Sequence, residues 1–347
     1  MTISETVTRI GERSRPGRKS VSETFSVDSP SWFMIIARMT KSGGQALIGL
    51  VVLTVSCSET RTEPPAFDGP KAYQYLKQQV ALSPRVPGSE ASAACRHLLS
   101  AHAAELGADI DSQAFTFFDP YSHTDIPLVN LIAGFKGTSR TSGRILLMAH
   151  YDSRPRTDYA QDPALLDRPI DGANDGASGV AVLMELAGLF AQQAPPADVD
   201  LVFVDGEDWG KAGDNNYYLL GSREFARRNI RGKYRFGVVL DMIGDASQEI
   251  YREGYAEQFY RPLNDALWQT AARLGVTAFH DSVKHFVMDD HLSVISAGVP
   301  AVVIIDFDYP HWHTEFDTPD KCSPQSLANV GRVLAEFIYN PALWPKN

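Results

Sequence analysis

The sequence lacks an excess of positive charge, has few cysteines and contains no long apolar run. Its formal net charge is −10 and its isoelectric point is about 5.4, so the clustered Lys and Arg residues of a nucleic-acid-binding surface are missing. Only three cysteines occur among 347 residues. The most apolar stretch, residues 46–55, is too short for a comfortable transmembrane helix. A nucleic-acid partner is therefore not expected.

The start of the chain differs from the rest. Residues 1–33 are rich in Ser, Thr and Arg and have little apolar periodicity, so we do not expect them to pack against a core. Residues 39–57 combine a short start, the apolar run and Cys57, which is typical of a bacterial secretory signal with a lipoprotein processing site. Met39 is then the expected true start, and residues 1–38 lie upstream of it.

This signal predicts an exported protein, periplasmic or on the outer surface, lipid-anchored at Cys57. An uncleaved membrane anchor is the alternative, and in either case the membrane is contacted only through the N-terminus. The remaining cysteines, Cys95 and Cys322, could pair in an oxidising compartment. Sequence alone does not decide whether they do.

The rest of the chain reads as a polar linker, residues 58–66, followed by one domain, residues 67–347. Within the domain, strand-like and helix-like segments alternate, with no internal repeat and no second boundary. Strands are expected at residues 128–135, 144–149, 201–204, 236–240 and 301–306, and helices at 73–82, 91–106, 178–192, 219–228, 262–274 and 324–339. Such alternation predicts an α/β three-layer sandwich with a mostly parallel, mixed central sheet and helices on both faces.

Several of the predicted strands end in a potential metal ligand or acid. Residues 144–149 lead into His150, residues 201–204 into Glu207 and Asp208, and residues 236–240 into Asp241. Carboxyl ends of parallel strands share one edge of a sheet, where open α/β folds bind ligands. Asp175 lies in a glycine-rich turn before a helix, and His313 follows the last strand. Aspartate and histidine are suitable zinc ligands, and a cation would relieve the repulsion among the acids.

Six motifs occur in a characteristic order: HYDS at 150–153, GANDGASG at 172–179, DGED at 205–208, LDMIG at 240–244, DDH at 289–291 and WHT at 312–314. In this order, and with Arg-Val-Pro-Gly-Ser at 85–89, the sequence resembles the zinc exopeptidases of the M28 peptidase family. The resemblance covers residues 67–340 and is specific because the motifs are several and ordered.

The resemblance implies roles for individual residues. Metal ligands of the family match His150, Asp175, Asp208, Asp241 and His313, with Asp175 in the bridging place between two ions, and the general base matches Glu207. In the family's peptidases this base takes a proton from a metal-held water and delivers it to the leaving amine. The cofactor implied is zinc, the substrates are peptide or protein N-termini, and a monomer is expected.

Within this family the sequence is most similar to bacterial glutaminyl-peptide cyclotransferases. Trp312 directly precedes His313, Asp289 precedes the Asp290-His291 pair, and Asp208 replaces the commoner glutamate. This resemblance implies one zinc held by Asp175, Asp208 and His313, with Glu207 and Asp289 catalytic and Asp241 and Trp312 binding substrate. One departure is Val303, where animal cyclases have a histidine.

Two other functions stay open. A di-zinc aminopeptidase would use the same residues, with His150 and Asp241 completing a second metal site. A non-catalytic binding module on the same fold predicts missing ligands or a missing base, and none is missing. Taken singly, Asp175 reads equally well as a helix N-cap, Asp289 and Asp290 as caps of the next helix, and Trp312 as a packing residue.

Overall fold

The computed structural model describes residues 63–139, 143–228 and 230–346. The expected signal peptide, Cys57 and the first part of the linker lie outside these residues. Across the ranges described, the helices are all too short or too polar to cross a membrane. The predicted anchor therefore stays a prediction.

Six strands form one mixed sheet in the order β1-β2-β4-β3-β5-β8. Strands β3 (Arg144–His150), β4 (Asp198–Val204), β5 (Phe236–Asp241) and β8 (Ala301–Ile305) are mutually parallel, whereas β1 (Asp109–Asp119) and β2 (Thr124–Phe135) join antiparallel at one edge. Strands β5 and β8 are buried at every position. Burial of this kind is expected of parallel strands that are covered on both faces, and it includes β8 although β8 ends the sheet.

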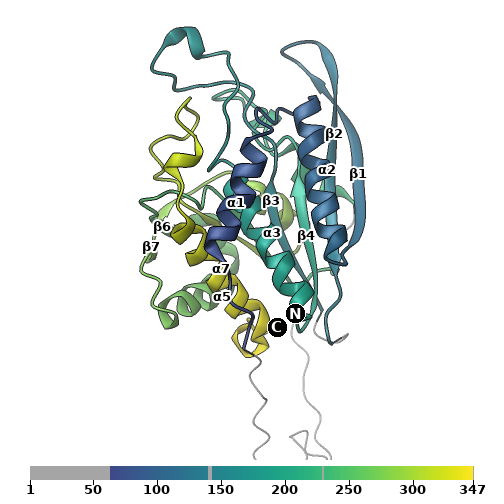
Figure 1. Cartoon of the computed structure of the whole chain (residues 1–347), viewed down its shortest axis with the longest axis vertical. Coiled ribbons are helices and arrows are strands. Elements are labelled where there is room, and N and C mark those ends of the chain that lie inside the picture. Colours follow the sequence, from purple (N-terminus) through teal and green to yellow (C-terminus); the bar gives the residue numbers. More distant parts are fainter. Residues whose placement is uncertain (1–62, 140–142, 229, 347) are drawn as a thin grey trace, which may run out of the picture. The chain divides into compact units, whose positions relative to one another are not determined.

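Helices cover both faces of the sheet, so the predicted three-layer sandwich is confirmed. Because side chains of a strand alternate between faces, Ile145 and Leu147 of β3 join one core, while Leu146 and Met148 join the other. The first core packs against α1 (Gly69–Val80), α2 (Glu90–Glu105), α3 (Ala177–Gln192), α5 (Gly254–Arg273) and α7 (Pro324–Tyr339) (Figure 1). The second core packs against α4 (Leu220–Arg227) and α6 (Asp290–Ser296).

Four features differ from the sequence expectations or go beyond them. Strand β1 was not expected, and neither was the separate parallel pair β6 (Ile250–Glu253) and β7 (Phe279–His285). Helix α5 begins at Gly254, two turns before the expected start at Pro262, and has a kink at Tyr260. The two remaining cysteines are buried free thiols, so Cys95 and Cys322 do not pair in this structure.

Candidate active site

The carboxyl ends of the parallel strands meet at one edge of the sheet, as the sequence predicted. Strand β3 ends on His150 and β5 ends on Asp241. Beyond β4 the chain turns at Gly206, whose φ of +72° favours glycine. This turn brings Glu207 and Asp208 to the same edge, where their backbone N–H groups donate to the buried carboxylate of Asp152 over 3.2 and 3.3 Å.

Asp175 precedes α3 but does not cap it. The N-cap is Gly176, which has no side chain to accept a capping hydrogen bond. The alternative that Asp175 is the N-cap of this helix is therefore wrong. Instead Oδ1 of Asp175 lies 3.1 Å from Nε2 of His150, and Oδ2 lies 3.7 Å from Nε2 of His313. The backbone N–H of Asp175 donates to Asp317 over 3.2 Å. Gly176 permits this approach, because a Cβ there would collide with the His150 ring.

His313 comes from the loop after β8 and has a left-handed backbone, with a φ of +55°. A non-glycine residue adopts this conformation rarely, and such strain clusters at functional sites. Nε2 of His313 lies 3.3 Å from Oδ1 of Asp208. The indole of Trp312 packs against the imidazole with ring centroids 3.9 Å apart. The last histidine thus faces the carboxylates of the earlier strands.

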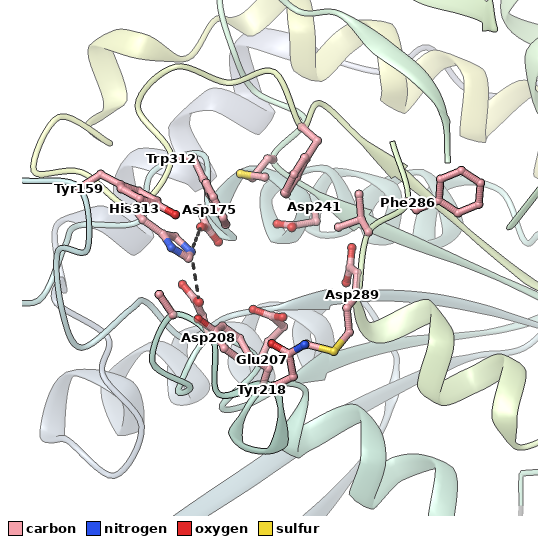
Figure 2. A pocket seen from close by; sticks show the side chains of 17 residues that line it. Tyr159, Asp175, Glu207, Asp208, Tyr218, Asp241, Phe286, Asp289, Trp312 and His313 are labelled. Atoms are coloured by element: carbon pink, nitrogen blue, oxygen red, sulfur yellow. Dashed lines mark ion pairs between the residues drawn. The ribbon is translucent and has the colours of Figure 1, made fainter. Parts of the chain in front are cut away.

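A cavity of about 270 Å³ opens beside these groups (Figure 2). It brings together nearly every side chain that the sequence proposed for the site, namely Asp175, Glu207, Asp208, Asp241, Asp289, Trp312 and His313. Of the proposed residues, His150 alone is absent from the lining; it is 1% exposed and contacts the lining residues Asp175 and Asp241. Asp289 also caps α6 by accepting from the backbone N–H of Asp290, so the capping residue that the sequence allowed also lines the cavity.

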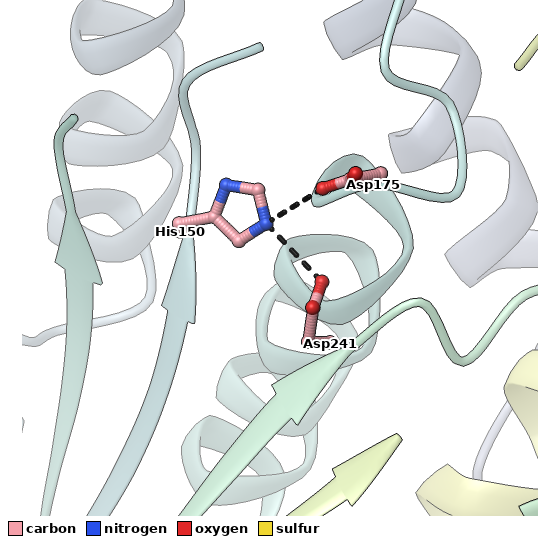
Figure 3. Close-up of side chains that lie close together, drawn as sticks. All are labelled: His150, Asp175 and Asp241. Atoms are coloured by element: carbon pink, nitrogen blue, oxygen red, sulfur yellow. Dashed lines mark hydrogen bonds and ion pairs between the residues drawn. The ribbon is translucent and has the colours of Figure 1, made fainter. Parts of the chain in front are cut away.

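Two groups of side chains have metal-binding geometry. We call them the His313 triad, formed by Asp175, Asp208 and His313, and the His150 triad, formed by His150, Asp175 and Asp241. In each, the candidate ligand atoms all lie within 4.8 Å of one another. The His150 triad is closed by contacts of Nε2 with Asp241 over 3.2 Å and with Asp175 (Figure 3).

The His313 triad fits a zinc ion by a separate observation. Oδ2 of Asp208 is buried and has no hydrogen-bond partner among the described residues. Such an unpaired buried carboxylate oxygen is costly unless something binds it. Two aspartates and one histidine are a donor set that zinc accepts, with a fourth position left for substrate.

Burial and mutual repulsion set the charges around the cavity. Burial, and then the carboxylate of Asp208, raise the pKa of Glu207 well above its ordinary value. Burial, then Asp241 and Asp290, do the same to the pKa of Asp289. Burial would also raise the pKa of Asp208, but the cations Arg154 and His313 hold it far below the usual range. Asp208 is therefore held as a carboxylate, whereas Glu207 and Asp289 hold protons more readily than ordinary acids do. Burial and the charge of Asp208 also raise the pKa of Asp175 to about 6.

Other lining residues were not assigned to the site from the sequence. Tyr159 and Phe286 line the cavity and are 54% and 63% exposed. Tyr218, expected only to pack or shape the entrance, lines it as well and accepts a hydrogen bond from Arg154 over 3.0 Å. The signature at residues 85–89 has a structural role, since the buried Arg85 donates to the carbonyl oxygens of Tyr151 and Gly172.

Comparison with known proteins identifies the family. Residues 130–338 match peptidase family M28. The chain belongs to this family. As an M28 member it is 28% identical over 286 residues to the glutaminyl-peptide cyclotransferase-like protein of Bos taurus, an alignment that covers 73% of this chain and 71% of that protein.

Solved structures of M28-like enzymes agree with this membership. Bacteroides thetaiotaomicron glutaminyl cyclase bound to N-acetylhistamine superposes with a TM-score of 0.75 and 34% identity, covering 80% of this chain and 99% of that one. A Zn-dependent exopeptidase from Parabacteroides distasonis gives 0.76 and 32%, covering 80% and 100%. This M28 protein is therefore an enzyme of the zinc exopeptidase fold, and the family implies zinc as its cofactor.

Proposed function

We propose that the chain is a zinc-dependent glutaminyl-peptide cyclotransferase, which converts an N-terminal glutamine to pyroglutamate and releases ammonia. The observation that carries this proposal is the lining of the cavity. Asp289 and Trp312, two of the features by which the sequence resembles cyclases, lie in one cavity with Glu207 and the His313 triad. The similarity to solved glutaminyl cyclases supports the same conclusion.

The reaction needs one proton moved within the substrate. The α-amine nitrogen forms a bond to the carbon of its own side-chain carboxamide, and the bond from that carbon to the amide nitrogen breaks. Glu207 takes a proton from the attacking amine and returns it to the departing ammonia, a transfer for which a raised pKa is suitable. Asp241 binds the amine, and Trp312 packs against the glutamine side chain.

We assign Asp175, Asp208 and His313 as the ligands of one zinc ion. When bound there, zinc supplies Lewis-acid polarisation of the carboxamide carbonyl. Asp289 supports Glu207 by sharing a proton with it, which suits two carboxyl groups whose pKa values are both raised by burial and by neighbouring carboxylates. His150 and Asp241 then stay as hydrogen-bonding groups, as their mutual contact of 3.2 Å supports.

The second candidate is a di-zinc aminopeptidase, favoured by the His150 triad and by the exopeptidase neighbour. Purified protein is incubated with a Gln-initiated peptide and, separately, with Leu-p-nitroanilide, and the products are weighed by mass spectrometry. Loss of ammonia without peptide cleavage supports the cyclase. Release of p-nitroaniline would show the aminopeptidase and overturn the first proposal.

Glu207→Gln tests the proton carrier. The amide has nearly the same shape but cannot accept the proton, so we expect turnover to fall by roughly a thousandfold while zinc content is unchanged. Asp214→Asn is a matched control, because Asp214 is half-buried near the entrance and outside the cavity lining. Retained turnover in Glu207→Gln would refute this role.

We also propose that Cys57 carries a lipid anchor, with residues 39–57 as the signal and residues 58–66 as the tether. The support is the sequence pattern alone. Cys57→Ser should release the enzyme from the membrane fraction of producing cells with its activity intact. If the variant stays in the membrane fraction, the lipoprotein assignment fails.

A further inference from the structure

Arg154 contacts the polypeptide around Asp208 at several points, although no motif drew attention to it. Its side chain is completely buried. One guanidinium nitrogen lies 2.5 Å from Oδ1 of Asp208 and donates to the backbone oxygen of the same residue over 3.1 Å. The other donates to the oxygen of Gly210 over 2.8 Å and to the Tyr218 hydroxyl. Arg154 therefore fixes both the carboxylate and the backbone of Asp208.

Residues 154–159, which we call segment 154–159, also contact His313, which lies far away along the sequence. Arg154 donates through Nε to Oδ2 of Asp158 over 2.6 Å, and that oxygen lies 3.2 Å from Nδ1 of His313. The backbone N–H of Tyr159 donates to the oxygen of His313 over 3.2 Å. The Tyr159 ring stacks on the imidazole at an angle of 17°. These contacts fix the position of both the imidazole and the strained backbone of His313.

Arg154 and Asp158 each contact one polar atom of a candidate zinc ligand. The 3.2 Å contact of Nδ1 of His313 with Asp158 favours a proton on Nδ1, which leaves the lone pair of Nε2 for a metal. The guanidinium of Arg154 binds Oδ1 of Asp208, whereas Oδ2 is the buried oxygen without a partner. His313 is thus held through Nδ1 and Asp208 through Oδ1, while Oδ2 of Asp208 keeps no hydrogen-bond partner among the described residues.

The His150 triad has a longer contact of this kind, from Nδ1 of His150 to Asp152. In the part of the chain that the structure describes, neither Arg154 nor Asp158 makes a hydrogen bond or ion pair with His150 or Asp241. Nδ1 of His150 lies 3.5 Å from Asp152 and has no hydrogen-bond partner there. The two triads share Asp175, so the difference between them comes from their other ligands.

We propose that Arg154 and Asp158 are positioning residues that orient Asp208 and His313 for a single zinc ion, and that segment 154–159 thereby makes the His313 triad the high-affinity site. This inference deepens the proposed function, since it rests on the same assignment of zinc ligands. It assigns the two residues no contact with substrate. Ligand-supporting groups of this kind typically contribute 10-fold to 100-fold to metal affinity.

The test is zinc affinity, measured on the purified full chain by competition with a chromophoric chelator. Asp158→Asn keeps the size of the side chain but removes the charge that faces both Arg154 and His313, and it should weaken zinc binding by roughly 10-fold to 100-fold. Asp167→Asn is the matched control, since Asp167 is an exposed residue of the same loop, and its zinc affinity should equal that of the wild type. Arg154→Lys should weaken zinc in the same direction as Asp158→Asn.

A second readout separates orientation from general stability. In the cobalt-substituted protein, Asp158→Asn should alter the visible absorption of the bound Co²⁺, whereas Asp167→Asn should not. Wild-type zinc affinity and an unchanged cobalt spectrum in a folded Asp158→Asn would overturn the inference, even if Arg154→Lys failed to fold. If His313→Ala also left zinc affinity unchanged, the ligand assignment itself would be wrong, and the proposed function would lose its basis.

Discussion

The two triads have the same ligand chemistry but different surroundings. Each has one histidine and two carboxylates, and they share Asp175. The His313 triad lies in the cavity wall, where Trp312 packs on its histidine and Asp208 keeps an unpaired oxygen. In the His150 triad only the histidine lies away from the cavity, and its Nε2 contacts Asp175 and Asp241 at 3.1 and 3.2 Å, whereas Nε2 of His313 lies 3.7 and 3.3 Å from its two carboxylates. The comparison teaches that a set of metal-binding side chains does not fix the number of ions; the contacts behind the ligands matter as well.

The largest expected effect separates the triads directly. His313→Ala should abolish stoichiometric zinc binding and turnover, because it removes one of three protein ligands and the imidazole that faces Asp208. His150→Ala should keep one zinc per chain. Metal is measured by elemental analysis of protein dialysed against metal-free buffer. Two zinc ions in the wild type, with one lost in each variant, would break the comparison and indicate the aminopeptidase.

A smaller effect is expected at Asp241, which lines the cavity but belongs to the His150 triad. Asp241→Asn should raise KM by roughly 10-fold to 100-fold, since a hydrogen bond from the amine to a charged carboxylate contributes about 1.5–3 kcal/mol. The zinc content should stay at one, and kcat should change much less. A loss of zinc with KM unaltered would show that Asp241 is a metal ligand. Asp245→Asn, with a carboxylate close by in sequence but outside the cavity lining, provides the control.

The strands of the central sheet could be predicted from the sequence because a strand that is buried on both faces has a distinctive apolar run. Residues 145–149 are uniformly apolar, as is typical of a strand covered on both faces. Strand β1 was not predicted because it lies at the sheet edge and most of its residues are at least partly exposed, so it has no apolar run. Helix α5 was predicted too short because Pro262 is typical of a helix start, yet here it lies inside a kinked helix.

The site was predictable where its residues follow strands or belong to ordered motifs. Asp175, Glu207, Asp208, Asp241 and His313 all come together as expected. Arg154 and Asp158 lie in an irregular segment whose partners are elsewhere in the chain, and an Arg-Asp pair four residues apart has no distinguishing pattern. Their contacts with Asp208 and His313 depend on the folded path of the loop.

The smallest effect concerns the metal-free chain. Although burial opposes a charged imidazole, the carboxylates of Asp208 and Asp158 raise the pKa of His313 to about 9, above its ordinary 6.5. The folded chain thus holds this proton more tightly than the unfolded chain does. The resulting stabilisation is complete below pH 6.5 and is lost as the pH rises through 9.

Zinc would bind the imidazole of His313 only when the coordinating nitrogen carries no proton. Stabilisation of the fold by bound zinc should therefore grow as the pH rises. We expect the Tm of metal-free wild type to fall by roughly 5 °C between pH 6.5 and 9 relative to metal-free His313→Gln, measured by circular dichroism after chelation. Added zinc should reverse the trend in the wild type. Parallel pH profiles for the two metal-free proteins would mean that Asp208 and Asp158 do not hold a proton on His313. The His313 triad would then be no better prepared for a cation than the His150 triad, and the contrast between them would rest on the cavity alone.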